Sequence, residues 1–166
     1  MSEIQYWINK LGLIPHPEGG YYKETYKSNE FIGMEGLPER FQSPRAFLTS
    51  IYYLLENSDF SRFHRLKSDE IWYYHAGNPV KAHIIPENGN YIEKMLGPNP
   101  EKNQAFQLII PQKSWFAVNV IPGNYNFALL GCAVAPGFEF EDFELARQGE
   151  LLKKYPEHSE IIKKFS

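Results

Sequence analysis

Residues 61–77, SRFHRLKSDEIWYYHAG, are the stretch of this chain that says most about its fold. Their second half is aromatic and β-branched, a composition that favours a strand. Successive side chains of a strand point to opposite faces, so Glu70, Trp72 and Tyr74 should share one face and His75 should lie on the other. We therefore expect Glu70 to point into the protein beside two aromatic rings.

Short apolar or alternating runs continue on both sides of this stretch, and Gly, Pro and Asn separate them. Eight such runs predict strands at residues 21–26, 46–55, 70–75, 80–85, 91–96, 105–110, 114–120 and 125–134. Residues 40–45, by contrast, read as a polar surface loop. The pattern indicates an all-β sandwich or barrel.

Helical patterns occur only near the two ends of the sequence. Residues 2–11 carry apolar side chains at helical spacing behind a Ser2-x-x-Gln5 capping pattern, and the predicted helix ends at Gly12. Residues 143–152 and 156–165 each carry an apolar stripe between charged residues. We expect these two C-terminal helices to pack on the outside of the barrel.

The composition limits the class of protein. A length of 166 residues fits one domain, 1–166, and 43% hydrophobic with 22% charged residues is ordinary for a globular chain. The net charge of -3 argues against nucleic acid and anionic membrane partners. No leader pattern and no apolar run of about 20 residues are present, so we expect a cytoplasmic protein. The single cysteine, Cys132, lies in an apolar run and reads as a small buried hydrophobe rather than a reactive thiol.

Residues 61–77 also carry a resemblance to the cupin superfamily. The first cupin motif places two His, a Glu and a Gly on a strand, a turn and a second strand, and here His64, Leu66, Glu70 and Gly77 stand in that register. The second motif, with a Pro, a Gly and a third His, falls on Pro111, Lys113 and Phe116 and matches poorly.

In finer detail, the chain resembles the single-domain, functionally uncharacterised cupins that are similar in fold to the dTDP-sugar 3,5-epimerases. The segments that carry this resemblance are residues 16–22, 63–65, 68–72, 75–77 and 136–140. The resemblance implies a cupin jelly-roll β-barrel, an internal cavity and a homodimer. It implies no particular reaction.

Metal binding is a minor alternative on chemical grounds. Metal-binding cupins use three His and one Glu, and three protein ligands are about the minimum for a catalytic first-row metal site. Leu66 and Phe116 stand at two of the His positions, which leaves only His64 and Glu70. We therefore expect no cofactor, and a divalent metal at this pair only as an alternative.

The pair His64 and Glu70 is instead the main candidate for a ligand site. In one interpretation the two side chains only hydrogen-bond each other or Arg62. In the other they are convergent polar groups in an aromatic pocket, which is the usual anatomy of a small-molecule site. His64 would then be a general base, and Glu70 would orient it or act as an acid if burial raises its pKa.

Several other residues are weaker candidates. Glu18, before Gly19 and Gly20, either closes the barrel mouth over a ligand or belongs to a simple turn. Trp115 either stacks on a ligand or packs in the core. Arg62 and Tyr74 complete the predicted ligand-binding set with Trp72. His16 and His158 read as surface residues, His83 fits a buried or a surface position, and residues 138–143 fit an edge segment laid over the barrel.

These observations lead to three hypotheses about function. The first is a cupin that binds a small polar molecule, such as a sugar nucleotide, a sugar phosphate or an organic acid, with isomerase or epimerase-type acid–base chemistry. The second is a binding or sensing module that uses the same cavity without turnover. The third is a metal-dependent cupin enzyme.

Overall fold

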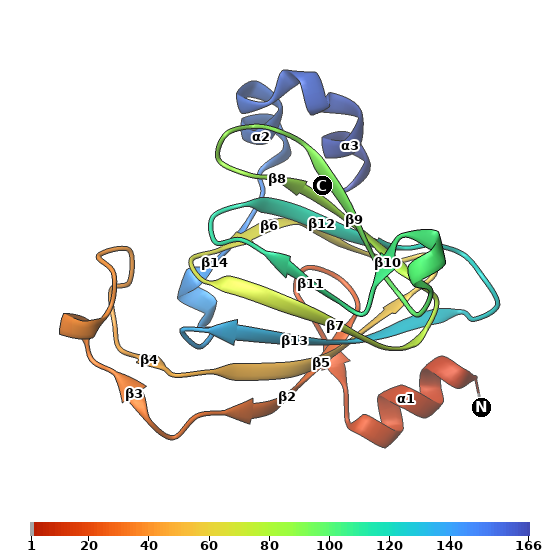
Figure 1. Cartoon of the computed structure of the whole chain (residues 1–166), viewed down its shortest axis with the longest axis horizontal. Coiled ribbons are helices and arrows are strands. Elements are labelled where there is room, and N and C mark those ends of the chain that lie inside the picture. Colours follow the sequence, from red (N-terminus) through yellow and green to blue (C-terminus); the bar gives the residue numbers. More distant parts are fainter. Residues whose placement is uncertain (1) are drawn as a thin grey trace.

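Two six-stranded sheets face each other in the computed structural model, which describes residues 2–166 (Figure 1). In spatial order, the first sheet contains β1 (Ile14–Pro15), β2 (Tyr21–Lys27), β5 (Thr49–Glu56), β13 (Phe127–Ala135), β7 (Asp69–Gly77) and β11 (Gln107–Ile110). The second contains β10 (Gln104–Ala105), β9 (Ile92–Leu96), β8 (Val80–Ile85), β12 (Trp115–Val120), β6 (Phe60–Leu66) and β14 (Phe143–Leu145). This arrangement is consistent with the predicted jelly roll.

The remaining elements lie outside this sandwich. A two-stranded arm, β3 (Phe31–Ile32) with β4 (Arg45–Ala46), extends from the end of the first sheet (Figure 1). The helices are α1 (Glu3–Leu11), α2 (Gln148–Lys154) and α3 (Ser159–Lys164). Short 3-10 turns occupy Met34–Gly36 (η1), Pro100–Lys102 (η2), Phe140–Asp142 (η3) and Pro156–His158 (η4).

The main core fills the space between the two sheets. Trp72 and Leu130 from the first sheet meet Ile84, Phe116 and Val118 from the second, and all five are almost completely buried. Burying such side chains stabilises the fold by about 1.5–3 kcal/mol each. This core fills one part of the sandwich and leaves an open space beside it.

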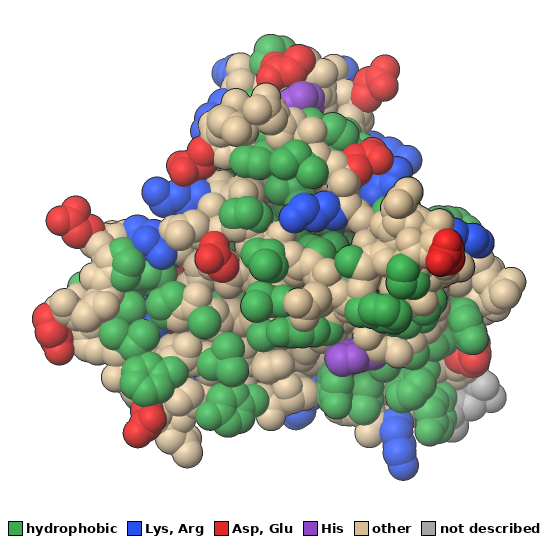
Figure 2. All heavy atoms as spheres, in the orientation of Figure 1, with side chains coloured by type: hydrophobic (Ala, Val, Ile, Leu, Met, Phe, Trp, Pro, Cys, Tyr) green, Lys and Arg blue, Asp and Glu red, His purple; other side chains and the backbone are tan. Residues whose placement is uncertain are grey.

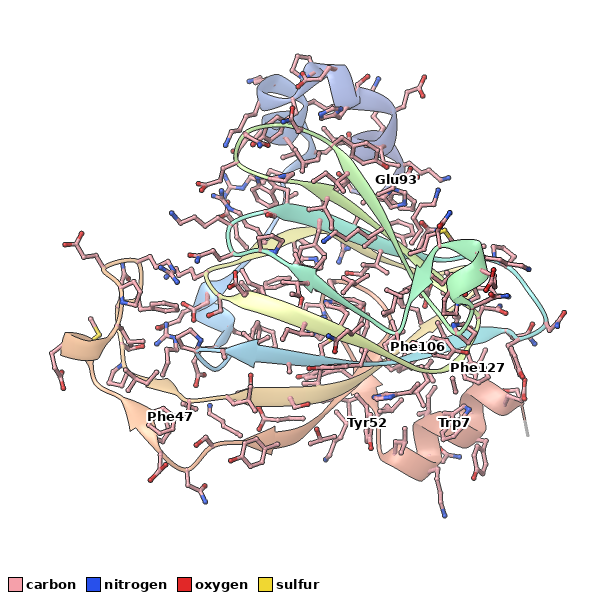
Figure 3. All side chains as sticks on the ribbon, in the orientation of Figure 1. Trp7, Phe47, Tyr52, Glu93, Phe106 and Phe127 are labelled. Carbon is pink, nitrogen blue, oxygen red and sulfur yellow. The ribbon has the colours of Figure 1, made fainter. Side chains whose placement is uncertain are left out.

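The helices cover the outer faces of the two sheets. The side chain of Ser2 accepts a hydrogen bond from Gln5 N at the start of α1, and Gly12 ends the helix in a left-handed conformation, as the sequence predicts. Trp7 of α1 packs against Phe127 of the first sheet, with ring centroids 6.2 Å apart (Figure 3). On the opposite side, α2 and α3 pack on the outer face of the second sheet, as predicted.

The predicted strands recur in the structure with small changes at their ends, and two local predictions are wrong. The helix predicted over residues 143–152 begins only at Gln148, because Phe143–Leu145 pairs with β6 as strand β14. The loop predicted at residues 40–45 ends in a buried residue, Arg45, whose side chain is 0% exposed. Strand β6 was absent from the eight predicted runs and appeared only within the cupin motif.

Apolar side chains also lie exposed on one face of the molecule. Figure 2 shows them over the β3–β4 arm and over β9 and β11. They include Phe31, Phe47, Ile92, Phe106 and Ile109. In residues 2–166, no helix is long and apolar enough to cross a membrane.

Candidate functional site

A cavity of about 260 Å³ lies between the two sheets, next to the main core. Its wall combines aromatic and aliphatic side chains with a small set of titratable groups. Strands of both sheets and the segment after β13 contribute to it. The lining residues are His16, Glu18, Tyr22, Glu24, Lys27, Thr49, Ile51, Tyr53, His64, Leu66, Glu70, Trp72, Cys132, Val134, Phe138, Glu139, Phe140 and Phe143.

His64 of β6 and Glu18 form a buried ion pair in this wall. Nε2 of His64 lies 3.0 Å from Oε2 of Glu18, and Nδ1 of His64 donates to the carbonyl oxygen of Arg62 at 2.7 Å. The hydroxyl of Ser61 donates to the other Glu18 oxygen. Both imidazole nitrogens therefore face oxygen acceptors, which favours the imidazolium form.

The pKa values of the two groups follow from this contact. Burial by itself would lower the pKa of His64, but the charge and the hydrogen bond of Glu18 raise it above its ordinary value. Burial would also favour the protonated form of Glu18, but the charge and hydrogen bond of His64 lower the pKa of Glu18 to about 2. The pair is thus an imidazolium and a carboxylate around neutral pH.

The turn at Gly19 and Gly20 brings Glu18 to the cavity. Both glycines have positive φ angles, +118° and +70°. A Cβ atom at Gly19 would lie 2.4 Å from the carbonyl oxygen of Phe60, and one at Gly20 would lie 2.5 Å from that of Leu54. Only glycine fits this close approach of the turn to β5 and β6, so these residues position Glu18 against His64.

Glu70 and Trp72 on β7 present unpartnered polar atoms in the same cavity wall. Within the described part of the chain, Oε2 of Glu70 and Nε1 of Trp72 are buried without a hydrogen-bond partner. Burial raises the pKa of Glu70 to about 7, although the charge of His64 and the adjacent indole N–H of Trp72 partly oppose this shift. A buried polar group that lacks a partner costs about 1–3 kcal/mol, so these two atoms favour a polar guest.

His16 and Tyr53 complete the polar part of the wall, and the sequence did not mark either as a site residue. His16 was predicted at the surface, but it lines the cavity, and its Nδ1 accepts a hydrogen bond from Glu18 N at 3.2 Å. Burial lowers the pKa of His16, although Glu18 partly opposes the shift. The hydroxyl of Tyr53 donates to the carbonyl oxygen of Gly19 at 2.7 Å. A signal for His16 was its place in the same short segment as Glu18.

The segment after β13 forms the rim of the cavity. Phe138, Phe140 and Phe143 line it, and Glu139 pairs with Lys27 of β2 at 2.5 Å. Asp142 anchors the segment from behind, because its carboxylate accepts two hydrogen bonds from the buried guanidinium of Arg45 at 2.6 and 2.7 Å. This agrees with the predicted segment laid over the barrel.

Three predicted ligand-binding residues lie away from the cavity. The guanidinium of Arg62 donates to the carbonyl oxygen of Pro17 on the outside of the turn. Trp115 packs under the C-terminal helices and beneath Arg65. Of the two interpretations of this residue, stacking on a ligand or packing in the core, the structure shows the second.

Tyr74 packs against the main core, and its hydroxyl donates to Gly77 O at 2.7 Å. An irregularity in the pairing of β7 with β13 falls between the partners of Ala76 and Tyr74. Glu70 and Trp72 lie on the N-terminal side of this irregularity. They follow the predicted alternation, and both line the cavity.

The other histidines lie elsewhere. His75 points to the outer face of the first sheet, beside Tyr52, as the alternation predicts. His83 is buried on the outer face of the second sheet, with its ring nitrogens near the Tyr91 hydroxyl and Asn119 Oδ1. His158 lies near the surface next to Gly89.

The residues of this cavity do not fit the metal site that many cupins carry. The ring of Phe116 packs on the ring of His64 with centroids 4.1 Å apart, and Leu66 adds an aliphatic wall. Both nitrogens of His64 face protein oxygens, so neither offers a free lone pair. Residues 2–166 contain no group of three or more His, Cys, Asp or Glu side chains arranged to hold a metal ion.

Comparisons with known proteins agree with this architecture. The chain is similar in structure to a hypothetical protein from Leishmania major, with a TM-score of 0.89 and 34% identity over 100% of this chain and 99% of that one. It is also similar to protein SO0799 from Shewanella oneidensis, with a TM-score of 0.87 and 35% identity over 100% and 98% of the two chains.

A curated relative is the uncharacterized protein YML079W of Saccharomyces cerevisiae. It is 29% identical over 160 residues, which cover 92% of this chain and 79% of the yeast protein. The family model described as "Cupin superfamily (DUF985)" matches residues 5–146, a range that includes every residue lining the cavity. The chain therefore belongs to this family of the cupin superfamily.

Proposed function

We propose that the chain binds a small polar molecule in the cavity between its sheets and transfers a proton to or from that molecule. The observation that carries the proposal is the pair of buried, unpartnered atoms Glu70 Oε2 and Trp72 Nε1 in one cavity wall. A native fold rarely leaves two buried polar atoms unsatisfied, and binding sites are where such atoms find partners.

Glu70 is the proton-transfer group in this proposal. Its pKa of about 7 means that both the acid and the carboxylate are well populated near neutral pH. A catalytic acid or base works best when its pKa lies near the working pH. Glu70 also lies in a wall with Phe, Trp and Ile side chains, which lower the polarity around its carboxyl group.

His64 has a supporting part, because both of its nitrogens are already engaged. The imidazolium remains next to Glu18 and near Glu70, where its positive charge favours the ionised carboxylate. His64 and Glu18 together therefore tune and position Glu70. In this proposal Glu70 exchanges the proton. The general-base role that the sequence suggested for His64 therefore belongs to Glu70.

The reaction class that fits these groups is an isomerisation of a hydroxy-aldehyde or hydroxy-ketone, because a single carboxylate takes and returns the proton on one face of the molecule. The Glu70 carboxylate removes a proton from a C–H bond next to a carbonyl group, and the electron pair of that bond moves to the carbonyl oxygen. The indole N–H of Trp72 stabilises the negative charge on this oxygen by a hydrogen bond. Glu70 then returns the proton to the former carbonyl carbon, while the proton of the hydroxyl group on the neighbouring carbon moves to the enolate oxygen. The carbonyl and hydroxyl groups thereby exchange places without net oxidation.

Deuterium exchange tests this proposal. Wild type is incubated in D₂O with a panel of hydroxy-aldehydes, hydroxy-ketones, sugar phosphates and small organic acids, and NMR detects deuterium at carbon. Exchange should occur with at least one compound and fall by about 10²- to 10⁴-fold in Glu70→Gln, the usual contribution of a general acid or base. Glu144→Gln, which changes an exposed carboxylate outside the cavity, should exchange like wild type.

Two outcomes would overturn the proposal. Binding to wild type without deuterium exchange across the panel would identify the protein as a binding or sensing module without turnover. Unchanged exchange in Glu70→Gln would remove Glu70 from the chemistry. The metal-dependent alternative predicts instead a near-stoichiometric transition metal in elemental analysis of the purified protein.

A further inference from the structure

The charges around the cavity point to the class of molecule that it takes. In the described chain, the side chains of the lining that can be cationic are Lys27 and the imidazoles of His16 and His64. No arginine belongs to the lining. Four carboxylates, those of Glu18, Glu24, Glu70 and Glu139, face the same space.

Each cation of this lining is already neutralised. His64 pairs with Glu18 at 3.0 Å, and Lys27 pairs with Glu139 at 2.5 Å. The Nδ1 atom of His16 accepts a backbone N–H, which is a contact of the neutral imidazole. An anionic guest would therefore lose its hydration without gaining a free positive charge, and desolvating an unpaired anion is costly.

The two unpartnered atoms, Trp72 Nε1 and Glu70 Oε2, can be satisfied by a ligand without charge. The indole N–H of Trp72 can only donate, so its partner must carry an acceptor oxygen or nitrogen. The second open atom, Oε2 of Glu70, donates when it is protonated and accepts from a hydroxyl when it is ionised. A carbonyl or hydroxyl oxygen satisfies both atoms without bringing a net charge.

The size of the cavity limits the guest further. Its volume of about 260 Å³ falls below the range of about 300–1,000 Å³ of pockets that bury drug-sized ligands. Aromatic side chains such as Phe138, Phe140 and Phe143 form much of the rim, where they suit the apolar face of a small molecule. A nucleotide with its phosphates fits neither the volume nor the charge.

We propose that the cavity takes a small uncharged molecule with a carbonyl or hydroxyl oxygen and discriminates against phosphates and carboxylates. This inference rests on the proposed function and narrows the candidate guests named from the sequence. At the rim, Glu139 neutralises Lys27, so this lysine of the lining does not attract anions.

Matched pairs of probes of equal shape test the inference. Lactamide is compared with lactate, and benzamide with benzoate, by titration into ¹⁵N-labelled protein. The readout is the indole N–H resonance of Trp72, which is identified by its loss in Trp72→Phe. At least one amide should shift this resonance, and its carboxylate partner should bind at least about tenfold more weakly.

A charge variant gives the converse test. Glu139→Gln removes the partner of Lys27 and should tighten lactate or benzoate binding by about fivefold, the size expected for one partly exposed ion pair. Glu24→Gln is the matched control, since it removes a carboxylate from the same lining without releasing a lysine. It should produce a smaller gain.

Two results would overturn the inference. One is a carboxylate probe that binds wild type as tightly as its amide, and the other is the absence of any shift at Trp72 with both amides. If the cavity prefers anions but deuterium exchange still depends on Glu70, the inference about uncharged guests is wrong and the proposed function stands. Loss of the proposed function would appear instead as amide binding combined with no deuterium exchange in any hydroxy-aldehyde or hydroxy-ketone of the panel.

Discussion

Nε2 of His64 lies 3.0 Å from Oε2 of Glu18, so a buried ion pair links strand β6 to the turn that precedes β2. Both side chains are less than a tenth exposed. The same contact closes one side of the cavity and fixes the protonation of both groups. Stability, cavity shape and chemistry therefore depend on one interaction.

Removing the imidazole should destabilise the protein strongly. In His64→Ala, Glu18 keeps the hydrogen bond from the Ser61 hydroxyl but loses its charged partner, and breaking a buried pair typically costs about 3–5 kcal/mol. Urea unfolding at pH 7 measures this loss. The double variant His64→Ala with Glu18→Gln should recover part of it, and equal stability of the single variant and wild type would contradict the buried pair.

Substitution of Glu70 should change how stability depends on pH. The pKa of Glu70 is raised from 4.5 to about 7, so between these values the folded state keeps a proton that the unfolded state has lost. Stability from this group therefore falls as pH rises, by up to about 3 kcal/mol above pH 7. Glu70→Gln should be more stable than wild type at pH 8 and similar to it at pH 4.5. A constant difference in the free energy of unfolding at both pH values would contradict the raised pKa.

Glu18 should make the protein less stable in acid, which is the opposite pH dependence to that of Glu70. Its pKa is lowered from 4.5 to about 2, so its contribution is complete above pH 4.5 and disappears as pH falls towards 2. Thermal unfolding between pH 5 and pH 2 in wild type and Glu18→Gln measures this contribution. The melting temperature of Glu18→Gln should fall less steeply than that of wild type, and parallel curves would refute the assignment.

The rim of the cavity should depend on the buried ion pair of Arg45 and Asp142. Asp142→Asn weakens a two-point contact with a guanidinium whose side chain is 0% exposed. Because Glu141 still pairs with Arg45, we expect a loss of about 3 kcal/mol, at the lower end of the range for a broken buried pair. Glu144→Gln breaks the more exposed pair with Arg65 and should cost less than about 1 kcal/mol. Urea unfolding compares the two variants, and similar small losses would show that the buried pair contributes little.

A single methyl group at Gly20 should disturb the turn that holds Glu18. Gly20→Ala combines a positive φ of +70° with a Cβ atom only 2.5 Å from Leu54 O, so we expect a loss of more than about 2 kcal/mol. Gly12→Ala has a similar φ of +65° but no atom within 4 Å of the new Cβ. It should lose only about 1–2 kcal/mol. Equal losses in thermal unfolding would show that the close approach to Leu54 is unimportant.

The homodimer implied by the resemblance stays a prediction. Exposed aromatic side chains such as Phe31, Phe47 and Phe106 are available for such an association. Figure 3 labels Phe47 and Phe106. Light scattering at micromolar concentration should report twice the mass of the 19.3 kDa chain. A monomeric mass would refute it. The cytoplasmic location also stays a prediction.

Local pattern was enough for much of this protein. The two-residue period of a strand predicted that Glu70 and Trp72 share the inner face and that His75 lies outside, because side-chain direction in a strand depends only on the local backbone. The caps of α1 were predictable for the same reason. The family resemblance added the jelly roll and a cavity at His64 and Glu70.

Tertiary structure decided which distant groups meet. The partner of His64 is Glu18, Arg45 is buried by Asp142, and Phe143–Leu145 is a strand because β6 offers it a free edge. None of these outcomes is encoded in a local period, since each depends on contacts between segments far apart in the chain. The sequence by itself thus determined which faces the strands present, whereas the packing of the two sheets decided which charges neutralise one another and which polar atoms remain open to a guest.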